Sequence, residues 1–498
     1  MENELFIFNS LTREKERFEP LHKGLVGMYV CGPTVYSDVH LGNCRTFVSF
    51  DVIYRYLMTI GYTVRYVRNI TDVGHLEGDQ DIGEDKISKR ARLEKIEPME
   101  VVQRFSNGFH QMMQTFNVLP PSIEPRATGH IIDQIEMIQQ ILANGYAYCK
   151  NGSVYFDTPK FMHDYDSYGQ LSGRVVEELI SESRQDLKGQ EEKNHPADFA
   201  LWIKADANHL MRWPSPWSIG FPGWHLECSV MSTKYLGKQF DIHGGGSDLK
   251  FPHHENEIAQ NIGAHHQTPA KYWLHGNMLL LNGKKMSKSE GNTITPFELF
   301  SGNSSHINKG YHPMIIRFFM LQAHYRSTID LTQQALDASE KGYLRLMEGN
   351  RILQNLIVEG KQVSDLDREI SQMVEKIYDE MNDDFNTPKA LARLFELVNK
   401  INALHDGHIP LSAITQKTLE LLKSTFHTFI YSVFGLKEII ENESANGLVD
   451  GLMELILDIR RSARVNKDWK TADQIRDTLT GLSIQLKDGK DGTSWTKG

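Results

Sequence analysis

The stretch LVGMYVCGPTVYSDVHLGNCRTFVSF, residues 25–50, decides the fold. Its first seven residues have the apolar character of a buried strand, which stops at Gly32-Pro33 because proline cannot donate to a sheet ladder. A helix is expected after Gly42, where aromatic residues recur at helical spacing, namely Phe47, Phe50 and Tyr54. Residues 63–70 alternate like a second strand, so the order strand, helix, strand predicts a parallel α/β unit.

The rest of the chain divides where this pattern changes. Asn151-Gly152 lies between two β-rich runs, a strong hairpin signal that breaks the α/β alternation. The alternation resumes with FDIHGGGSDL, which we interpret as a strand over 240–243 running into a glycine-rich turn, with a helix beginning near Pro252. From about Thr332 the apolar residues follow a helical period. We therefore expect an α/β parallel-sheet domain split by an α+β insertion, then an α-helical bundle and a small C-terminal domain, with segments 1–119, 120–205, 206–331, 332–445 and 446–498.

Composition narrows the class of protein. The 498 residues, 40% hydrophobic and 24% charged, are typical of a globular chain of about two to four domains. The start carries no targeting signal and no apolar run is long enough to span a bilayer, so we expect a cytoplasmic protein without membrane contact. The four cysteines are too few for a disulfide framework, which favours metal binding or catalysis for at least two of Cys31, Cys44, Cys149 and Cys228.

The formal net charge of -10 argues against a general nucleic-acid coating protein. A local basic face is still compatible with it, and one candidate lies near the C-terminus at Arg460, Arg461, Arg464, Lys467 and Lys470. A solvated helix face without a partner explains the same cluster equally well.

Two short motifs point to phosphate chemistry. The tetrapeptide His40-Leu41-Gly42-Asn43 lies between a buried strand and a helix, where helix N-terminal amides bind phosphates, although a surface turn explains these four letters alone. Lys285-Met286-Ser287-Lys288-Ser289 suits a mobile anion clamp, because lysine is a compact charge on a flexible stem. An exposed charged loop is the alternative, and the pairing of both motifs in this order argues against it.

With these motifs the chain resembles a class I aminoacyl-tRNA synthetase, which implies a Rossmann-like catalytic domain. The resemblance implies that His40, Gly42 and Asn43 contact ATP, while Lys285 and Lys288 stabilise the pentavalent phosphorus of adenylate formation. Asn43 departs from the motif, since it stands where a second histidine is usual and cannot supply a cation. We expect catalysis to depend little on that position.

Four further groups suggest a zinc site. Zinc favours thiolate, imidazole and carboxylate ligands in tetrahedral sites, and Cys31, Cys228, His253 and Glu257 supply them. His253 and Glu257 are four apart on the helix that Pro252 opens, so both project from one face. Taken singly, each cysteine is compatible with a core residue and the His-Glu pair with an ordinary surface pair.

Longer matching stretches identify the resemblance as one to the cysteinyl-tRNA synthetase family. They run in family order across nearly the whole chain and include CGPTVY at 31–36, NITD at 69–72, GWHLECS at 223–229, HGGGSDLKFPHHENE at 243–257, GKKMSKSEGN at 283–292 and DDFNTPKAL at 383–391. The resemblance implies one Zn²⁺ per chain, held by those four ligands, that binds the thiolate of L-cysteine directly. A hydrophobic pocket rejects a hydroxyl isostere by only ~10²-fold, so selection by a metal would make editing unnecessary.

The same resemblance implies the remaining partners and residues. Thr71, Trp224 and His243 would line the cysteine pocket, and Gly244, Gly246 and Asp248 would face the adenosine of ATP bound with Mg²⁺. The helical bundle would bind tRNA-Cys and the small C-terminal domain its anticodon, and we expect a monomer.

Two departures and two alternatives accompany this interpretation. Residues 74–84 lengthen a segment that is shorter in the commonest family form, and Phe221 stands where a basic residue is usual. A ligase that passes cysteine to a sugar amine is the first alternative, but such relatives lack a long C-terminal part. A non-catalytic zinc protein or thiol sensor is the second, and it would not need two phosphate motifs.

Overall fold

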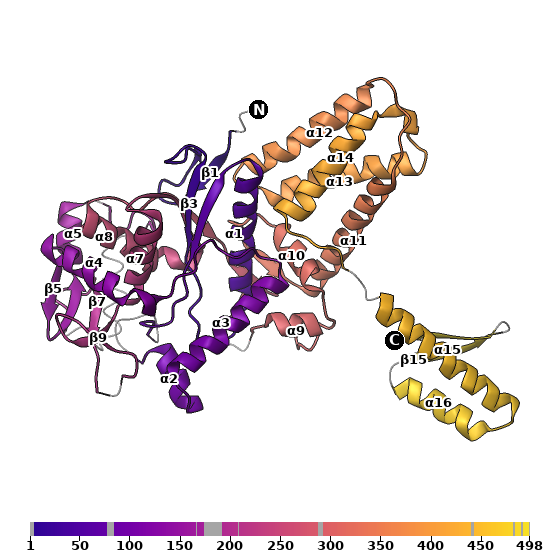
Figure 1. Cartoon of the computed structure of the whole chain (residues 1–498), viewed down its shortest axis with the longest axis horizontal. Helices are drawn as coiled ribbons and strands as arrows, with labels where there is room; N and C mark the ends of the chain where they lie inside the picture. Colours follow the sequence, from indigo (N-terminus) through magenta and orange to yellow (C-terminus); the bar gives the residue numbers. More distant parts are fainter. Residues whose placement is uncertain are drawn as a thin grey trace. The chain divides into compact units, whose positions relative to one another are not determined.

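The structure, a computed structural model, describes residues 4–76, 84–165, 167–173, 192–207, 209–286, 292–439, 443–481, 484–489 and 492–497. The chain forms two compact units, Met1–Lys437 and Glu438–Gly498 (Figure 1). The second unit begins slightly before the boundary at 446 expected from the sequence.

A parallel four-stranded sheet carries the first unit. Its order is β11-β10-β3-β4, and every neighbouring pair is parallel, which confirms the predicted α/β class. The four strands are β3 (Leu25–Val30), β4 (Thr63–Arg68), β10 (Phe240–Gly246) and β11 (Ala270–Gly276). Because β3 and β4 pair in register up to Val30↔Arg68, the residues that follow them emerge at one edge of the sheet. The carboxyl ends of parallel strands are where such folds bind ligands.

Helix α1 (Leu41–Thr59) connects β3 to β4 and packs on the sheet through its buried aromatic face. Its Phe50 ring lies so close to β10 that a Cβ on Gly244 would come within 2.2 Å of it. The predicted glycine-rich turn is therefore wrong at 244–246. The glycines continue the strand because only a residue without a side chain admits the ring there, and the chain turns at η4 (Ser247–Lys250) instead.

The insertion is a separate antiparallel sheet of order β5-β6-β7-β9-β8. The predicted hairpin joins β5 (Ala147–Lys150) to β6 (Ser153–Phe156), and Asn151 and Gly152 both have positive φ, 54° and 91°, as this turn requires. The sheet runs past residue 205, because it also includes β7 (Phe199–Lys204), β8 (Trp213–Pro214) and β9 (Ile219–Pro222).

The first unit has further elements before its helical region. They are β1 (Phe6–Asn9), β2 (Glu14–Arg17), α2 (Lys86–Glu94), α3 (Pro98–Thr115), η2 (Ala127–His130), α4 (Ile131–Ala143), α5 (Thr158–Asp164), α7 (Trp224–Leu236), α8 (His253–His265), β12 (Leu279–Leu281), β13 (Lys284–Lys285), α9 (Pro296–Ser301), α10 (Pro313–Leu321) and β14 (Ile329–Leu331). Helix α7 follows the insertion directly and packs against α8. Helices α7 and α8 precede and follow β10 in the chain, and α7 also packs against β3.

The predicted helical region follows β14. It consists of α11 (Gln333–Asn355), α12 (Asp365–Asn382), α13 (Thr387–His405), η5 (Leu411–Ala413), α14 (Gln416–Phe426) and the π-helical turn η6 (His427–Val433). A buried charge network joins it to α1, since the Arg317 guanidinium donates to Asp51 and to the Phe434 carbonyl. Fully buried charges need such pairing, so this contact fixes the helical region on the α/β part of the first unit.

The second unit contains α15 (Glu443–Val465), α16 (Trp469–Gly481) and a hairpin of β15 (Ile484–Gly489) with β16 (Gly492–Lys497). Of the basic cluster, Arg460 is 7% exposed and does not belong to an open face, whereas the other four cations are exposed. Among the described residues, none of the helices combines the length and apolarity needed to cross a membrane.

Candidate active site

The sequence-predicted metal ligands converge at the carboxyl edge of the parallel sheet. Cys31 directly follows β3, Cys228 lies on the second turn of α7, and His253 and Glu257 lie one turn apart on α8. All four side chains are buried. Their ligand atoms lie within 4.8 Å of one another, so the structure brings the whole predicted set together.

The separations within this set fit a tetrahedral ion. With Zn–S near 2.3 Å and Zn–N or Zn–O near 2.0 Å, donor atoms around zinc lie roughly 3.3–3.8 Å apart. Cys31 Sγ lies 3.6 Å from Cys228 Sγ and 3.7 Å from Glu257 Oε1. His253 Nε2 lies 3.2 Å from the same Glu257 oxygen. Two sulfurs, an imidazole nitrogen and a carboxylate oxygen are the donors that zinc prefers.

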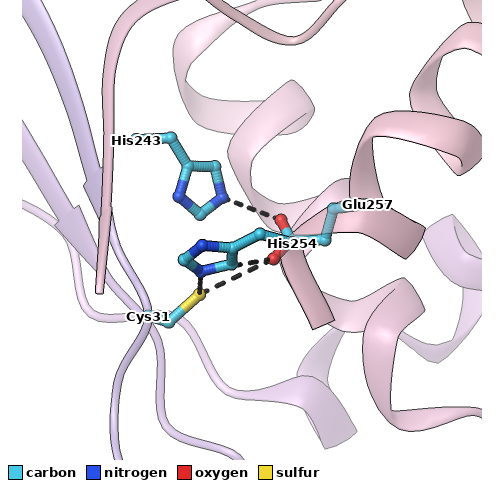
Figure 2. A group of neighbouring side chains, drawn as sticks. All are labelled: Cys31, His243, His254 and Glu257. Carbon is cyan, nitrogen blue, oxygen red and sulfur yellow. Dashed lines mark hydrogen bonds and ion pairs between the residues drawn. The ribbon is translucent and has the colours of Figure 1, made fainter. Parts of the chain in front are cut away.

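A second set overlaps the first and consists of Cys31, His243, His254 and Glu257. Figure 2 shows His254 and Glu257 beside the Cys31 sulfur, and His243 on the other oxygen of the Glu257 carboxylate. His254 Nε2 lies 3.3 Å from Cys31 Sγ and 3.9 Å from Glu257 Oε1, and His243 Nε2 lies 2.8 Å from Glu257 Oε2. This set offers one sulfur, which makes it the poorer match to a zinc site with two thiols.

Of the candidate imidazoles, His253 and His254 each contact another histidine. His253 Nδ1 lies 3.0 Å from His225 Nδ1, and His254 Nδ1 lies 2.8 Å from His275 Nε2. Such outer partners orient a ligand ring and fix its tautomer. His225, His254 and His275 were not among the residues predicted from the sequence. The doubled histidine in FPHHENE and the histidine in GWHLECS were signals for the first two, whereas His275 in β11 had none.

Burial controls the protonation of these groups. It raises the pKa of the Cys228 thiol to about 12 and the pKa of the Cys31 thiol well above its ordinary value. It lowers the pKa values of His254 and His275 well below the usual range, so both rings are neutral. Metal binding must therefore displace thiol protons, and we expect affinity for the metal to rise with pH.

The three predicted pocket residues border this cluster. Thr71 donates through its hydroxyl to the buried Glu227 carboxyl, which Asn69 also contacts at 3.2 Å. The half-buried Trp224 ring lies 4.5 Å from the His253 ring, centroid to centroid. His243 is fully buried, and its Nδ1 has no hydrogen-bond partner among the described residues. Burial raises the pKa of Glu227 well above its ordinary value.

The HLGN motif begins α1 as predicted. His40 is the N-cap, and its Nδ1 accepts a hydrogen bond from the Asn43 amide at 3.3 Å. Asn43 Oδ1 accepts from the His40 amide in return, at 3.4 Å, which completes a capping box. The side chain of Asn43 therefore has a structural task that needs no positive charge. Gly42 lies between the two residues and faces the His40 ring.

We predict that Asn43→His changes the rate of ATP–pyrophosphate exchange by less than about tenfold, because a carboxamide already fulfils the capping task. Asn43→Ala should lower the free energy of unfolding by about 0.5–1.5 kcal/mol through loss of one hydrogen bond. Exchange kinetics and urea unfolding measure the two effects. A hundredfold gain in the histidine variant would show that a cation is wanted at this position.

The lysine motif begins in β13 and leaves it toward residues 287–291, which lie outside the described residues, as does the predicted Lys288. Lys285 is exposed and pairs with Leu280 across the β12–β13 hairpin. Arg45 of α1 donates to the carbonyls of Asn277 and Ser327, which precede β12 and β14. One buried guanidinium thus links the HLGN helix to the strands that carry the lysine loop.

The residues predicted to face the adenosine of ATP lie at the end of β10 and just beyond it. Gly244 and Gly246 lie at the end of that strand, and Asp248 is in η4 just beyond it. Phe221, one of the two departures, is buried in β9 and stacks on the His209 ring at 4.1 Å. An apolar ring at position 221 is therefore a packing residue of the insertion sheet.

Comparison with known proteins agrees with this geometry. Residues 17–341 match the model of the class I (C) tRNA synthetase catalytic domain, and residues 376–438 match the DALR domain. The chain is 53% identical to a cysteine–tRNA ligase of Porphyromonas gingivalis, with 99% of each chain covered. The chain belongs to the cysteine–tRNA ligase family. A member from Deinococcus radiodurans is 46% identical, with 99% of this chain and 96% of that protein covered.

The fold of this cysteine–tRNA ligase family member also resembles that of another class I enzyme. Methionyl-tRNA synthetase of Mycobacterium tuberculosis, solved in complex with methionyl-adenylate, superposes with a TM-score of 0.56 at 14% identity. The match covers 82% of this chain and 89% of that one. This likeness concerns the fold, and it agrees with the parallel Rossmann-like sheet described above.

Proposed function

We propose that this chain activates L-cysteine with ATP and transfers it to the 3′-terminal adenosine of tRNA-Cys, with one zinc ion selecting the substrate thiol. The observation that carries the proposal is the convergence of Cys31, Cys228, His253 and Glu257 at the carboxyl edge of the parallel sheet in a member of this family. The two alternatives lose ground, because the chain matches its relatives over 99% of its length and retains both phosphate motifs.

When bound, zinc would supply a Lewis acid that lowers the pKa of a thiol and bonds its sulfur strongly, which a serine hydroxyl cannot match. We assign its retention to Cys31, Cys228, His253 and Glu257, because two sulfurs and the observed spacings suit zinc. The His225 ring orients His253 and thereby holds the ligand set in place.

The remaining pocket residues would bind the rest of cysteine. Trp224 supplies an apolar wall beside the His253 ring, and the Thr71 hydroxyl is fixed by its bond to Glu227. His243 offers its buried Nδ1 to a polar group of the substrate. A buried nitrogen without a hydrogen-bond partner raises the free energy of the complex unless the substrate pairs with it. The His243 Nδ1 therefore favours a substrate with a polar group at this point.

The chemistry then needs no protein nucleophile. The cysteine carboxylate attacks the α-phosphorus of ATP, pyrophosphate leaves, and cysteinyl-adenylate forms. The ribose hydroxyl of the terminal tRNA adenosine next attacks the carbonyl carbon, and AMP leaves. We assign ATP binding with Mg²⁺ to His40, Gly42, Asn43, Gly244, Gly246 and Asp248, and stabilisation of the charge on phosphorus to Lys285 and Lys288.

The C-terminal parts would bind the tRNA. The DALR match and the four exposed cations of the basic cluster, Arg461, Arg464, Lys467 and Lys470, suit contacts with phosphates. We assign the bundle to the tRNA body and the second unit to the anticodon. A monomeric, cytoplasmic enzyme is the simplest form of this proposal.

The test is ATP–pyrophosphate exchange with each of several amino acids, followed by charging of a tRNA-Cys transcript. We expect exchange with cysteine and a rate with serine at least about 10³-fold lower, beyond the ~10² that a hydrophobic pocket achieves. Equal exchange with serine would refute the role of the thiol. Activation of cysteine without any charging of the transcript would refute the second step alone.

A further inference from the structure

The lengthened segment at 74–84 has a well-defined base where it leaves and rejoins the fold. Gly74 has φ of 81°, and a Cβ there would lie 2.6 Å from the Pro222 carbonyl oxygen, so the chain passes tightly against the stretch before α7. Asp85 closes the base, because its carboxylate accepts from the Gly74 amide at 3.1 Å and also caps α2. A bridge between Leu76 and Asp85 completes it.

This base presents one imidazole to the pocket. The His75 ring stacks on the Trp224 indole with centroids 3.9 Å apart and planes inclined by 9°. His75 is 8% exposed, so the stacked faces are shielded from water. Offset or parallel aromatic contact of this kind stabilises one orientation of the indole.

Hydrogen bonds fix the His75 ring on both nitrogens. Its Nδ1 lies 2.6 Å from Thr34 Oγ1, and its Nε2 lies 2.7 Å from Lys86 Nζ. The Lys86 ammonium can only donate, so Nε2 accepts and Nδ1 carries the proton that it donates to Thr34. The ring therefore cannot rotate without breaking one of these bonds, and Trp224 packs against a rigid surface.

Trp224 passes this constraint to the metal cluster. It is the first residue of α7, one turn before Cys228, so both side chains project from the same face of the helix. Its ring also lies 4.5 Å from that of His253. The ring contacts therefore run from His75 through Trp224 to His253, one of the proposed zinc ligands.

We propose that His75 is a positioning residue that holds Trp224 as the wall limiting the size of the amino-acid side chain. This role rests on the proposed function. It explains how the pocket distinguishes thiols of different length, which a metal ion alone does not do. A metal that binds thiols accepts cysteine and its one-methylene homologue homocysteine alike, so rejection of the longer thiol falls to a rigid apolar wall. The segment at 74–84 thus contributes a specificity determinant through its first residues.

The experiment measures ATP–pyrophosphate exchange with cysteine and homocysteine in the full-length chain. For His75→Ala we expect the KM for cysteine to rise about tenfold and the preference for cysteine over homocysteine to fall about tenfold. The KM for ATP should stay within about twofold, because the contacts of His75 lead to the amino-acid pocket. His75→Phe keeps a flat ring and should recover most of the loss.

Controls separate this role from a general structural one. His209→Ala removes a similar stack, on Phe221 with planes inclined by 10°, and should leave the cysteine preference unchanged. Thr34→Val retains the imidazole and replaces His75→Ala if that variant does not fold; it should show a smaller loss in the same direction. Zinc content and thermal unfolding of each variant are measured alongside.

The outcomes are distinct. Two results for His75→Ala overturn the role of His75 while the wild-type activity stands: an unchanged cysteine preference, or a lowered kcat together with similar rises in the KM for cysteine and the KM for ATP. A wild-type chain without cysteine-dependent exchange overturns the proposed function itself.

Discussion

Cys228→Ser is expected to abolish zinc binding and to lower cysteine-dependent ATP–pyrophosphate exchange roughly a thousandfold. Loss of an outer partner of a ligand typically costs about 10–100-fold in affinity or activity, and loss of a ligand should cost more. Serine is nearly isosteric, but its hydroxyl does not ionise near neutral pH and bonds zinc weakly. Zinc content by atomic emission and exchange kinetics measure the two effects independently.

The matched control is Cys149→Ser, which makes the same chemical change at an exposed cysteine and should keep full zinc content and activity. His254→Ala distinguishes the two overlapping donor sets, because His254 belongs only to the second of them. If Cys228→Ser kept its zinc while His254→Ala lost it, the ion would be held by the other set. The assignment of Cys228 would then be wrong even if the enzyme is a zinc protein.

The fold and the ligand set illustrate what local sequence patterns can specify. The β3-α1-β4 unit followed from an apolar run, a Gly-Pro stop and aromatic residues at helical spacing, all of which act within about one element. Asn151-Gly152 fixed the hairpin because its backbone conformation is a property of those two residues. The four proposed ligands came from motifs with family resemblance, and their proximity is a property of the folded chain.

What could not be predicted depends on contacts between distant elements. The glycines at 244–246 looked like a turn, and only the approach of Phe50 from α1 explains why they continue a strand. His275 lies in β11, and its role beside His254 depends on how α8 packs on that strand. The role of Arg45 could not be predicted from the sequence, because its hydrogen bonds go to backbone carbonyls more than two hundred residues away.

Lys285→Met is expected to lower the rate constant for cysteine activation by about 10²–10³-fold with little change in the KM for ATP. Removal of one preorganised donor aimed at developing charge has this magnitude in other enzymes. An interaction made mainly in the transition state lowers kcat without weakening ground-state binding. Methionine keeps the length of the side chain and removes the charge, so exchange kinetics at varied ATP concentration isolate the electrostatic contribution.

The neighbouring Lys284 provides the control, since both lysines are exposed residues of β13. The backbone at Lys285 is held independently of its ammonium, because it pairs with Leu280 and its carbonyl accepts from Asn292 at 2.9 Å. Truncation of either side chain should therefore leave the hairpin intact, and Lys284→Met should change kcat by less than about threefold, as expected of an exposed charge. Equal losses in the two variants would mean that the positive field of the loop matters and the position of one ammonium does not. A raised KM for ATP at constant kcat in Lys285→Met would assign this lysine to ground-state binding of ATP.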